Sequence, residues 1–595
     1  MVIYNFQLRK IFSIFLLTVI CSGWTHNTFA EIISPELIVF NAKVTTQNNA
    51  QPEAEAVAIH NGRFLKVGPN TEILKLKSKT TKIIDAEGRR MIPGLNDSHL
   101  HVIRGGRFYN LELRWEGVSS LKQALSMLSE QAKRTPKGQW VRVIGGWSPY
   151  QFIEKRMPTL DEINNAAPDT PVFILFLYSQ AFLNKAGLKE LNITAKTPAP
   201  KGGRYELDNE GNPTGLLIAE PNPTILYQTI GQLPQLSAKQ QVNSSKQFYR
   251  ELNRLGLTSA IDAGGGGHIF PENYEGSRTL ASSGELPMRI SYYLFPQKPT
   301  KEVSEFKRWM TLSVPGLNTH TGHEHGYEME GGGEFLVWSA GDYENFMSSR
   351  PVQTDEMEPE LERVTRLLIK NRWPFRIHAT YNQSIERILA VFEKINNETP
   401  FEGLRWAIDH AETITPNNIS RIKKLGGGIA IQSRMAFAGE YFSKRYGKKT
   451  AKTSPPIREM LRQGIPVGAG TDGTRVSSYN PWIGLYWLVS GKTIGGNQLY
   501  DKSNRLDRAG ALRLYTLGSA WFSNEENIKG RIAPGQYADF ALLTDDYFSV
   551  SEEKIKNITS VLTVVNGNIV FGSETFQSLS PALPRATPSW SPVNR

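Results

Sequence analysis

The chain has 595 residues, of which 39% are hydrophobic and 21% are charged. This length exceeds one ordinary domain and allows a large buried core, and the composition excludes wholesale disorder. The formal net charge of +11 comes from Lys and Arg residues scattered along the chain, with no basic block interleaved with aromatic residues. That distribution argues against a nucleic-acid partner.

The first 30 residues have the layout of a secretory signal peptide. Arg9 and Lys10 precede an apolar run over residues 11–20, and a small-x-small cleavage site ends at Ala30. The run is shorter than the roughly 20 residues that a spanning helix needs. We therefore expect cleavage near Ala30, a periplasmic or secreted protein, and no stable membrane insertion.

The only cysteine, Cys21, lies inside this segment. A mature chain without cysteine has no disulfides, no cysteine nucleophile and no thiolate metal ligands. Any metal ion must then be held by His, Asp, Glu or Lys-derived groups.

Short strands separated by turns are predicted near both ends of the chain. They cover residues 37–44, 56–59, 64–67 and 82–85, and then 540–544, 560–565 and 568–571. We expect residues 31–91 and 530–575 to form one small β-sandwich domain. The tail over residues 576–595 is rich in Pro and Ser and is predicted to be a surface strap or disordered.

The middle of the chain, residues 92–529, alternates apolar strand-like runs with helical patterns, which favours an α/β fold with parallel strands. The predicted strands are residues 92–96, 258–262, 289–295, 375–378, 404–409, 428–432 and 467–470. Helical patterns cover residues 360–371, 382–395 and 456–463. Residues from about 107 to 245 break this rhythm, and we interpret them as a large insertion that covers the mouth of the site.

His99 and His101 are separated by one residue at the end of a predicted strand. Side chains alternate along a strand with a period of two, so both imidazoles point to the same side. Both can therefore reach one cation.

Three further polar residues each end an apolar strand: His378, His410 and Asp472. His410 follows His378 by 32 residues, and Asp472 follows His410 by 62. Because a strand-plus-helix unit takes roughly 30 residues, these side chains belong to strands n, n+1 and n+3 of one parallel barrel. Barrel enzymes keep their chemistry at the carboxyl ends of the strands. The five residues together therefore predict a metal site.

Residues 93–101, Pro-Gly-Leu-Asn-Asp-Ser-His-Leu-His, resemble the Pro-Gly-x-x-Asp-x-His-x-His segment of the amidohydrolase superfamily. Residues 530–540 resemble its C-terminal signature, and residues 145–147, 213–220 and 480–481 resemble the amidohydrolase family 3 branch, which includes N-substituted formamide deformylases. The resemblance covers nearly all of the mature chain. It implies a (β/α)₈ TIM barrel, with His378, His410 and Asp472 after strands five, six and eight, and with Asp472 as the proton shuttle.

Family members often carry a carboxylated lysine after strand four, which bridges two metal ions. The corresponding stretch here, residues 326–335, contains no lysine. A glutamate could take its place: we expect Glu328, with Glu330 and Glu334 as alternatives. Otherwise the site holds a single ion.

Four residues are predicted to contact the substrate. Trp147 and Asn480 lie in the segments that resemble family 3. Gln180 stands where relatives tend to have a histidine. His268 follows the glycine run 264–267, which lacks the Gly-Lys-Ser/Thr of a phosphate-binding loop.

Two other groups of residues have a functional and an ordinary interpretation. The histidine-rich stretch 319–325 could bind metal, but a polar loop is favoured. Tyr178, Trp482 and Trp487 suggest an aromatic pocket, although core packing explains such residues equally well.

The resemblance implies hydrolysis of a carbon–nitrogen bond other than a peptide bond, in an amide or an N-formyl or N-acyl amine, by metal-activated water. The expected cofactor is a divalent metal, zinc first, as one or two ions, with iron or manganese as alternatives. Deamination or cyclic-amide opening could use the same ligands, and ester hydrolysis is within reach of the scaffold. A non-catalytic periplasmic binding protein is an alternative of another class. The expected partner is a small-molecule substrate, and a homodimer is possible because barrel hydrolases often form dimers.

Overall fold

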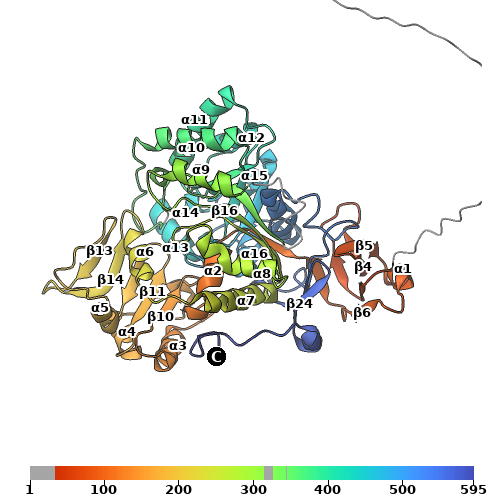
Figure 1. The fold of residues 1–595 in the computed structure, drawn as a ribbon, viewed down its shortest axis with the longest axis horizontal. Helices are drawn as coiled ribbons and strands as arrows, with labels where there is room; N and C mark the ends of the chain where they lie inside the picture. Colours follow the sequence, from red (N-terminus) through yellow and green to blue (C-terminus); the bar gives the residue numbers. More distant parts are fainter. Residues whose placement is uncertain (1–33, 314–325, 344, 595) are drawn as a thin grey trace, which may run out of the picture.

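The computed structural model describes residues 34–313, 326–343 and 345–594 (Figure 1). The predicted signal peptide and the whole histidine-rich stretch 319–325 lie outside these residues. At the centre is an eight-stranded sheet in the order β21-β20-β19-β18-β17-β16-β15-β8. Its strands in chain order are β8 (Leu95–Leu100), β15 (Leu257–Asp262), β16 (Arg289–Leu294), β17 (Tyr327–Gly332), β18 (Phe375–Ala379), β19 (Trp406–His410), β20 (Gly428–Gln432) and β21 (Val467–Gly470).

The sheet closes into a barrel where its first and last strands meet. The Asp472 N–H, just beyond β21, donates to the His99 carbonyl of β8 at 2.8 Å. Gly470 permits this approach, because a Cβ there would lie 2.5 Å from the His99 nitrogen. The predicted (β/α)₈ barrel is confirmed.

The segments that follow the barrel strands form helices. Their apolar residues recur at three- and four-residue spacing and so lie on one face, which packs against the barrel. In α10, for example, Leu361, Val364 and Leu368 are buried. The barrel helices are α2 (Val102–Phe108), α7 (Ala238–Arg254), α8 (Glu275–Ser282), α9 (Glu302–Leu312), α10 (Met357–Lys370), α11 (Asn382–Glu398), α12 (Pro416–Lys424), α13 (Met435–Tyr446), α14 (Lys448–Ala451), α15 (Ile457–Gln463), α16 (Pro481–Ser490) and α17 (Arg508–Arg513).

Strands from both ends of the chain share one six-stranded sheet, β24-β23-β22-β7-β2-β3, beside a four-stranded sheet, β5-β4-β1-β6. The N-terminal strands are β1 (Leu37–Phe40), β2 (Lys43–Thr45), β3 (Glu53–Ala54), β4 (Ala56–His60), β5 (Arg63–Gly68), β6 (Lys82–Asp85) and β7 (Arg90–Pro93), with α1 (Asn70–Ile73) between β5 and β6. The C-terminal strands are β22 (Phe540–Leu543), β23 (Ser560–Val565) and β24 (Asn568–Gly572), with α18 (Glu552–Ile555) after β22.

The strand predicted over residues 92–96 is two strands. The first, β7, pairs with β22 in the β domain, while β8 begins the barrel after Gly94. The chain therefore passes from one domain to the other at Gly94, whose N–H donates to the Asp539 carbonyl at 2.9 Å.

A third sheet, in the order β13-β14-β12-β11-β10-β9, is built from the part of the chain between α2 and α7 and is orange to yellow in Figure 1. Its strands are β9 (Glu112–Leu113), β10 (Val141–Ile144), β11 (Val172–Phe176), β12 (Gln180–Leu183), β13 (Gly203–Leu207) and β14 (Pro213–Ala219). Its helices are α3 (Leu121–Arg134), α4 (Leu160–Ala166), α5 (Lys185–Glu190) and α6 (Thr224–Gly231). The predicted limit at residue 245 falls inside α7, a continuous helix that leads into β15.

The C-terminal tail runs as a strap along α7 to α3, the dark blue trace at the bottom of Figure 1. Asn110 and Gln131 side chains donate to the carbonyls of Thr587 and Trp590, each at 2.8 Å. No helix in the described part of the chain is both long and apolar enough to cross a membrane.

Candidate active site

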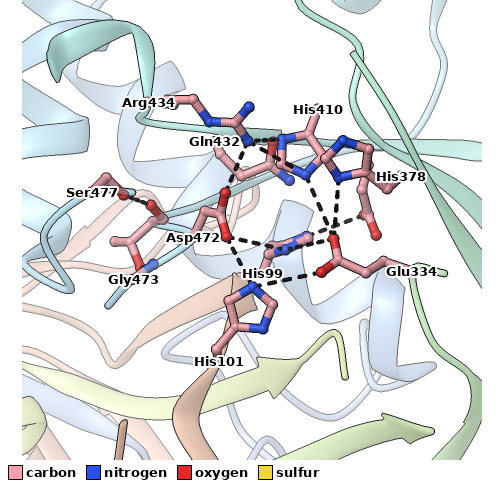
Figure 2. A network of polar contacts seen from close by, with 12 residues as sticks. His99, His101, Glu334, His378, His410, Gln432, Arg434, Asp472, Gly473 and Ser477 are labelled. Carbon is pink, nitrogen blue, oxygen red and sulfur yellow. Dashed lines mark hydrogen bonds and ion pairs between the residues drawn. The ribbon is translucent and has the colours of Figure 1, made fainter. Parts of the chain in front are cut away.

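Polar side chains from five barrel strands converge at the carboxyl ends of those strands (Figure 2). His99 lies in β8 and His101 directly follows it, while His378 and His410 lie at the ends of β18 and β19. Asp472 stands two residues beyond β21. The structure thus brings together the five residues that strand spacing predicted, all of them buried.

Glu334, two residues beyond β17, is the sixth member of this cluster. Its Oε2 lies 3.3 Å from His99 Nε2, 3.5 Å from His378 Nδ1 and 3.6 Å from His410 Nε2. Its Oε1 lies 3.6 Å from His101 Nε2. Burial raises the pKa of Glu334, but the surrounding histidines, His99 first, outweigh burial, so the pKa lies well below its ordinary value.

Glu328, the glutamate expected at this position, is not part of the cluster. It is the second residue of β17 and lies toward the opposite end of the barrel, where Glu525 and Lys529 are its charged neighbours. Glu334 follows Glu328 by six residues, and β17 ends between them at Gly332. The glutamate that faces the four histidines is therefore Glu334.

Each histidine has one ring nitrogen toward the cluster and the other toward a second group. The outer nitrogens of three histidines lie near an oxygen: His99 Nδ1 near Asp409 at 3.5 Å, His101 Nδ1 near the Gly264 carbonyl at 2.5 Å, and His378 Nε2 near Asp342 at 3.2 Å. The outer nitrogen of His410, Nδ1, contacts the Arg434 guanidinium, with Glu412 at 3.7 Å. Such outer partners fix the tautomer and ring orientation of metal-binding histidines.

Asp472 joins the cluster from the opposite side to Glu334 (Figure 2). Its Oδ1 lies 3.0 Å from His101 Nε2 and 3.6 Å from His99 Nε2, while its Oδ2 accepts a hydrogen bond from Arg434 at 2.9 Å. Burial raises the pKa of Asp472, but the hydrogen bond with His101 and the charges of His99 and Arg434 outweigh it. The carboxyl group is therefore ionised.

The backbone is strained at two of these residues. His410 has φ of 79° and Asp472 has φ of 55°. Non-glycine residues rarely adopt positive φ, and such conformations persist at sites where the surrounding structure holds them in place. Both residues lie at the mouth of the barrel, at the carboxyl ends of β19 and β21.

A buried ion pair supports the cluster from below. The Arg376 guanidinium binds both oxygens of Asp409 and also donates to the Ser98 carbonyl at 3.0 Å. Asp97 accepts hydrogen bonds from the His99 N–H at 3.0 Å and the Thr471 hydroxyl at 2.6 Å. These contacts tie β8, β18, β19 and β21 together directly under the histidines.

The donor set fits a divalent metal ion. Three groups of side chains each offer ligand atoms within 4.8 Å of one another: His99, His101 and Glu334; His99, His410 and Asp472; Glu334, His378 and His410. The nitrogen–oxygen distances of 3.3–3.6 Å around Glu334 Oε2 are too long for good hydrogen bonds. They suit ligands that surround a common cation, and imidazole and carboxylate are its ordinary ligands.

A cavity of about 370 Å³ opens above the cluster. Its floor includes His101, Glu334, His378, His410 and Asp472. Its walls are mainly aromatic: Tyr178, Tyr227, Phe295, Phe335, Trp338 and Tyr343. A cavity of this size and character suits a small organic molecule.

The four residues predicted to contact substrate do not line this cavity. Trp147 is buried in the insertion, where its indole N–H donates to the Leu175 carbonyl. Asn480 caps α16 by accepting from the Trp482 N–H. Gln180 pairs with β11 and β14. His268 is buried beside the cavity, next to Gly265.

Of the other aromatic residues that suggested a pocket, only Tyr178 lines the cavity, whereas Trp482 and Trp487 are buried in the core. Sequence reasoning missed Arg434, Asp342 and Glu412, which contact the cluster. The signal available for Glu412 was its place two residues after His410, and Arg434 similarly follows the end of β20.

Comparison with known proteins agrees with this geometry. Residues 82–571 match the model of the amidohydrolase family. The chain is 27% identical to the protein YtcJ of Bacillus subtilis (strain 168), over 87% of this chain and 96% of that protein. It is 23% identical to the N-substituted formamide deformylase of Arthrobacter pascens, over 89% of this chain and 97% of that protein.

Among solved structures, an uncharacterized metal-dependent hydrolase from Pyrococcus horikoshii OT3 superposes with a TM-score of 0.61 at 20% identity, over 87% of this chain and 99% of that one. This likeness shows the shared fold. Because the family model spans most of the chain, including every residue of the cluster, the protein belongs to the amidohydrolase family and is a metal-dependent hydrolase.

Proposed function

We propose that the protein hydrolyses a carbon–nitrogen bond in a small amide, with N-formyl and N-acyl amines as the leading substrates. The likeness to the N-substituted formamide deformylase supports this substrate class. The predicted signal peptide supports action in the periplasm or outside the cell. The complete cluster does not favour a non-catalytic binding protein.

The arrangement of the histidines carries the proposal. All four direct one nitrogen toward Glu334 or Asp472. The other nitrogen of His99, His101 and His378 faces a fixed oxygen, and that of His410 contacts the Arg434 guanidinium. Glu334 is shared by the group with His99 and His101 and the group with His378 and His410. A carboxylate shared by two groups supports two ions. Imidazole and carboxylate ligands suit zinc, iron or manganese, and the family resemblance puts zinc first.

When bound, a divalent cation supplies Lewis acidity, which activates water near neutral pH and polarises a carbonyl. Asp472 is ionised and faces the cavity, so it can accept a proton from the attacking water and deliver it to the leaving nitrogen. Arg434 holds one oxygen of Asp472 and thereby keeps the other directed at His101. The aromatic walls orient an apolar part of the substrate and exclude water.

The test is elemental analysis of the purified protein with parallel assays on N-formyl and N-acyl amines. We expect about two metal ions per chain in the wild type, fewer in Glu334→Ala, and the wild-type number in the matched variant Glu328→Ala. Loss of metal in Glu328→Ala but not in Glu334→Ala contradicts the assignment of Glu334. Hydrolysis of aminated heterocycles or cyclic amides, with none of open amides, overturns the proposed substrate class.

A further inference from the structure

Three buried arginines gather at one side of the cavity. Arg104 and Arg107 lie in α2, directly after His101, and Arg475 follows Asp472 by three residues. Arg104 lines the cavity and is 3% exposed. A Cβ added at Gly265 would lie 3.1 Å from His101 Nδ1 and 3.2 Å from Arg104 Nη1. The Arg104 guanidinium is therefore next to a residue of the catalytic cluster.

Within the described part of the chain, negative charges act on Arg104 only from beyond ion-pair distance: burial lowers its pKa, but Tyr178, Tyr227, Asp472 and Asp262 outweigh burial and raise it. No carboxylate there forms an ion pair with Arg104, Arg107 or Arg475, and Arg104 Nε and Nη2 make no hydrogen bond. Arg107 donates only to neutral oxygens, those of Gln241 at 3.3 Å and Gly267 at 3.4 Å. The Arg475 guanidinium lies 4.7 Å from the centre of the Tyr227 ring.

Two other buried arginines form ion pairs, whereas buried Arg142 donates to the Pro234 carbonyl. Arg376 binds Asp409, and Arg289 binds Asp539. Burying a charge without an ion-pair partner destabilises the folded state, and removing one partner of a buried ion pair is strongly destabilising. Arg104, Arg107 and Arg475 therefore lack the carboxylate partner that offsets the cost of burying Arg376 and Arg289.

The arginines also repel one another. Burial and the neighbouring Arg475 lower the pKa of Arg107 to about 10. Both ring nitrogens of buried His268 lack hydrogen-bond partners among the described residues, and a Cβ at Gly265 would lie 2.8 Å from His268 Nε2. An anion at this position would relieve the repulsion and occupy the empty hydrogen-bonding positions.

We propose that Arg104, supported by Arg475 and Arg107, binds an anionic group of the substrate. This inference rests on the proposed amide hydrolysis and names its substrate class: an amide with a carboxylate close to the scissile nitrogen, as in an N-acyl α-amino acid. There, two bonds separate the nitrogen from the carboxyl carbon, which matches the closeness of Arg104 to His101. A guanidinium binds a carboxylate with two parallel hydrogen bonds. The aromatic walls receive the apolar part.

The test compares N-formylphenylalanine with N-formyl-2-phenylethylamine, which differ only in the carboxylate. We expect the wild type to prefer the acid by about 10- to 100-fold in kcat/KM, as hydrogen bonds to a charged group imply. In Arg104→Met this ratio falls to near one. The exposed Arg278→Met, on α8, is the matched control and keeps the ratio. Equal preference for both substrates in the wild type overturns the inference while leaving amide hydrolysis intact.

A binding measurement separates this inference from the proposed function. Calorimetric titration with 3-phenylpropanoate, its neutral amide and 2-phenylethylphosphonate reports anion binding without catalysis. We expect both anions, and not the amide, to bind the wild type, and Arg104→Met to lose at least tenfold in affinity. Tighter binding of the phosphonate identifies a phosphate-like substrate group. Anion binding that is lost in Arg104→Met, without hydrolysis of any amide, supports the anion site and refutes the proposed reaction. Should Arg104→Met fail to fold, Arg104→Gln replaces it, and wild-type affinity in that variant overturns the inference.

Discussion

Strand β17 carries one glutamate near its start and another just beyond its end, and the two have opposite surroundings. Glu334 at the mouth faces histidines that lower its pKa well below the ordinary value. Near the base, burial and Glu525 raise the pKa of Glu328 to about 7, against the smaller effect of Lys529. The groups at the mouth of the barrel thus stabilise the ionised form of a glutamate, whereas the surroundings at the base destabilise it. This difference matches the division of barrel enzymes into a catalytic face and a stabilising face.

The largest effect is expected from the mouth. Asp472→Asn removes the proton acceptor and should lower kcat by roughly 10³-fold, within the range for general acid–base groups. Steady-state kinetics together with metal analysis would measure this. Glu328→Gln at the base should keep kcat within about twofold. A tenfold or smaller loss in Asp472→Asn would assign the proton transfer to another group.

The base should respond in stability instead. Arg289 and Asp539 form a buried ion pair at 2.9 Å between the barrel and the β domain. Arg289→Met leaves Asp539 buried and unpaired, which should cost about 3 kcal/mol of unfolding free energy. The exposed pair Arg278–Glu275 provides the control, where Arg278→Met should cost less than about 1 kcal/mol. Denaturant unfolding of both variants tests this, and equal losses would contradict the comparison.

The smallest effect concerns pH. Because the pKa of Glu328 is raised from 4.5 to about 7 in the folded state, the unfolded chain releases this proton first. Its contribution to stability is therefore full below pH 4.5 and is lost as pH rises toward 7. Glu328→Gln should match the wild type near pH 4.5 and be more stable by about 2 kcal/mol at pH 8. Parallel unfolding curves at both pH values measure this, and a variant less stable at pH 8 would show that the carboxylate is needed.

Much of the fold was open to prediction because its signals are local. The strand over residues 428–432 was predicted with the bounds of β20. His378, His410 and Asp472 belong to strands n, n+1 and n+3 as their spacing indicated, because these strand-plus-helix units have nearly constant length. The family resemblance identified the strands as five, six and eight. The strand over residues 92–96 was wrong, since an apolar run does not show that Gly94 divides it between two sheets.

Trp147 and Asn480 illustrate a different limit. Their segments resemble family motifs, but the structure uses the Trp147 indole in packing and the Asn480 amide as a helix cap. A motif records that a residue type belongs at a position. It does not record whether the side chain faces substrate or the protein itself.

The sequence by itself determined the barrel, its two-ended β domain and the five residues at the strand ends, because strand periodicity and unit length are properties of neighbouring residues. Only the tertiary structure chose Glu334 over Glu328 and Glu330. Glu328 and Glu330 lie in β17, and Glu334 lies two residues beyond its end. The position along the barrel axis, which the sequence does not give, decides which of the three reaches the histidines. The grouping of Arg104, Arg107 and Arg475 was likewise decided by tertiary structure, because barrel closure brings β8 and β21 together.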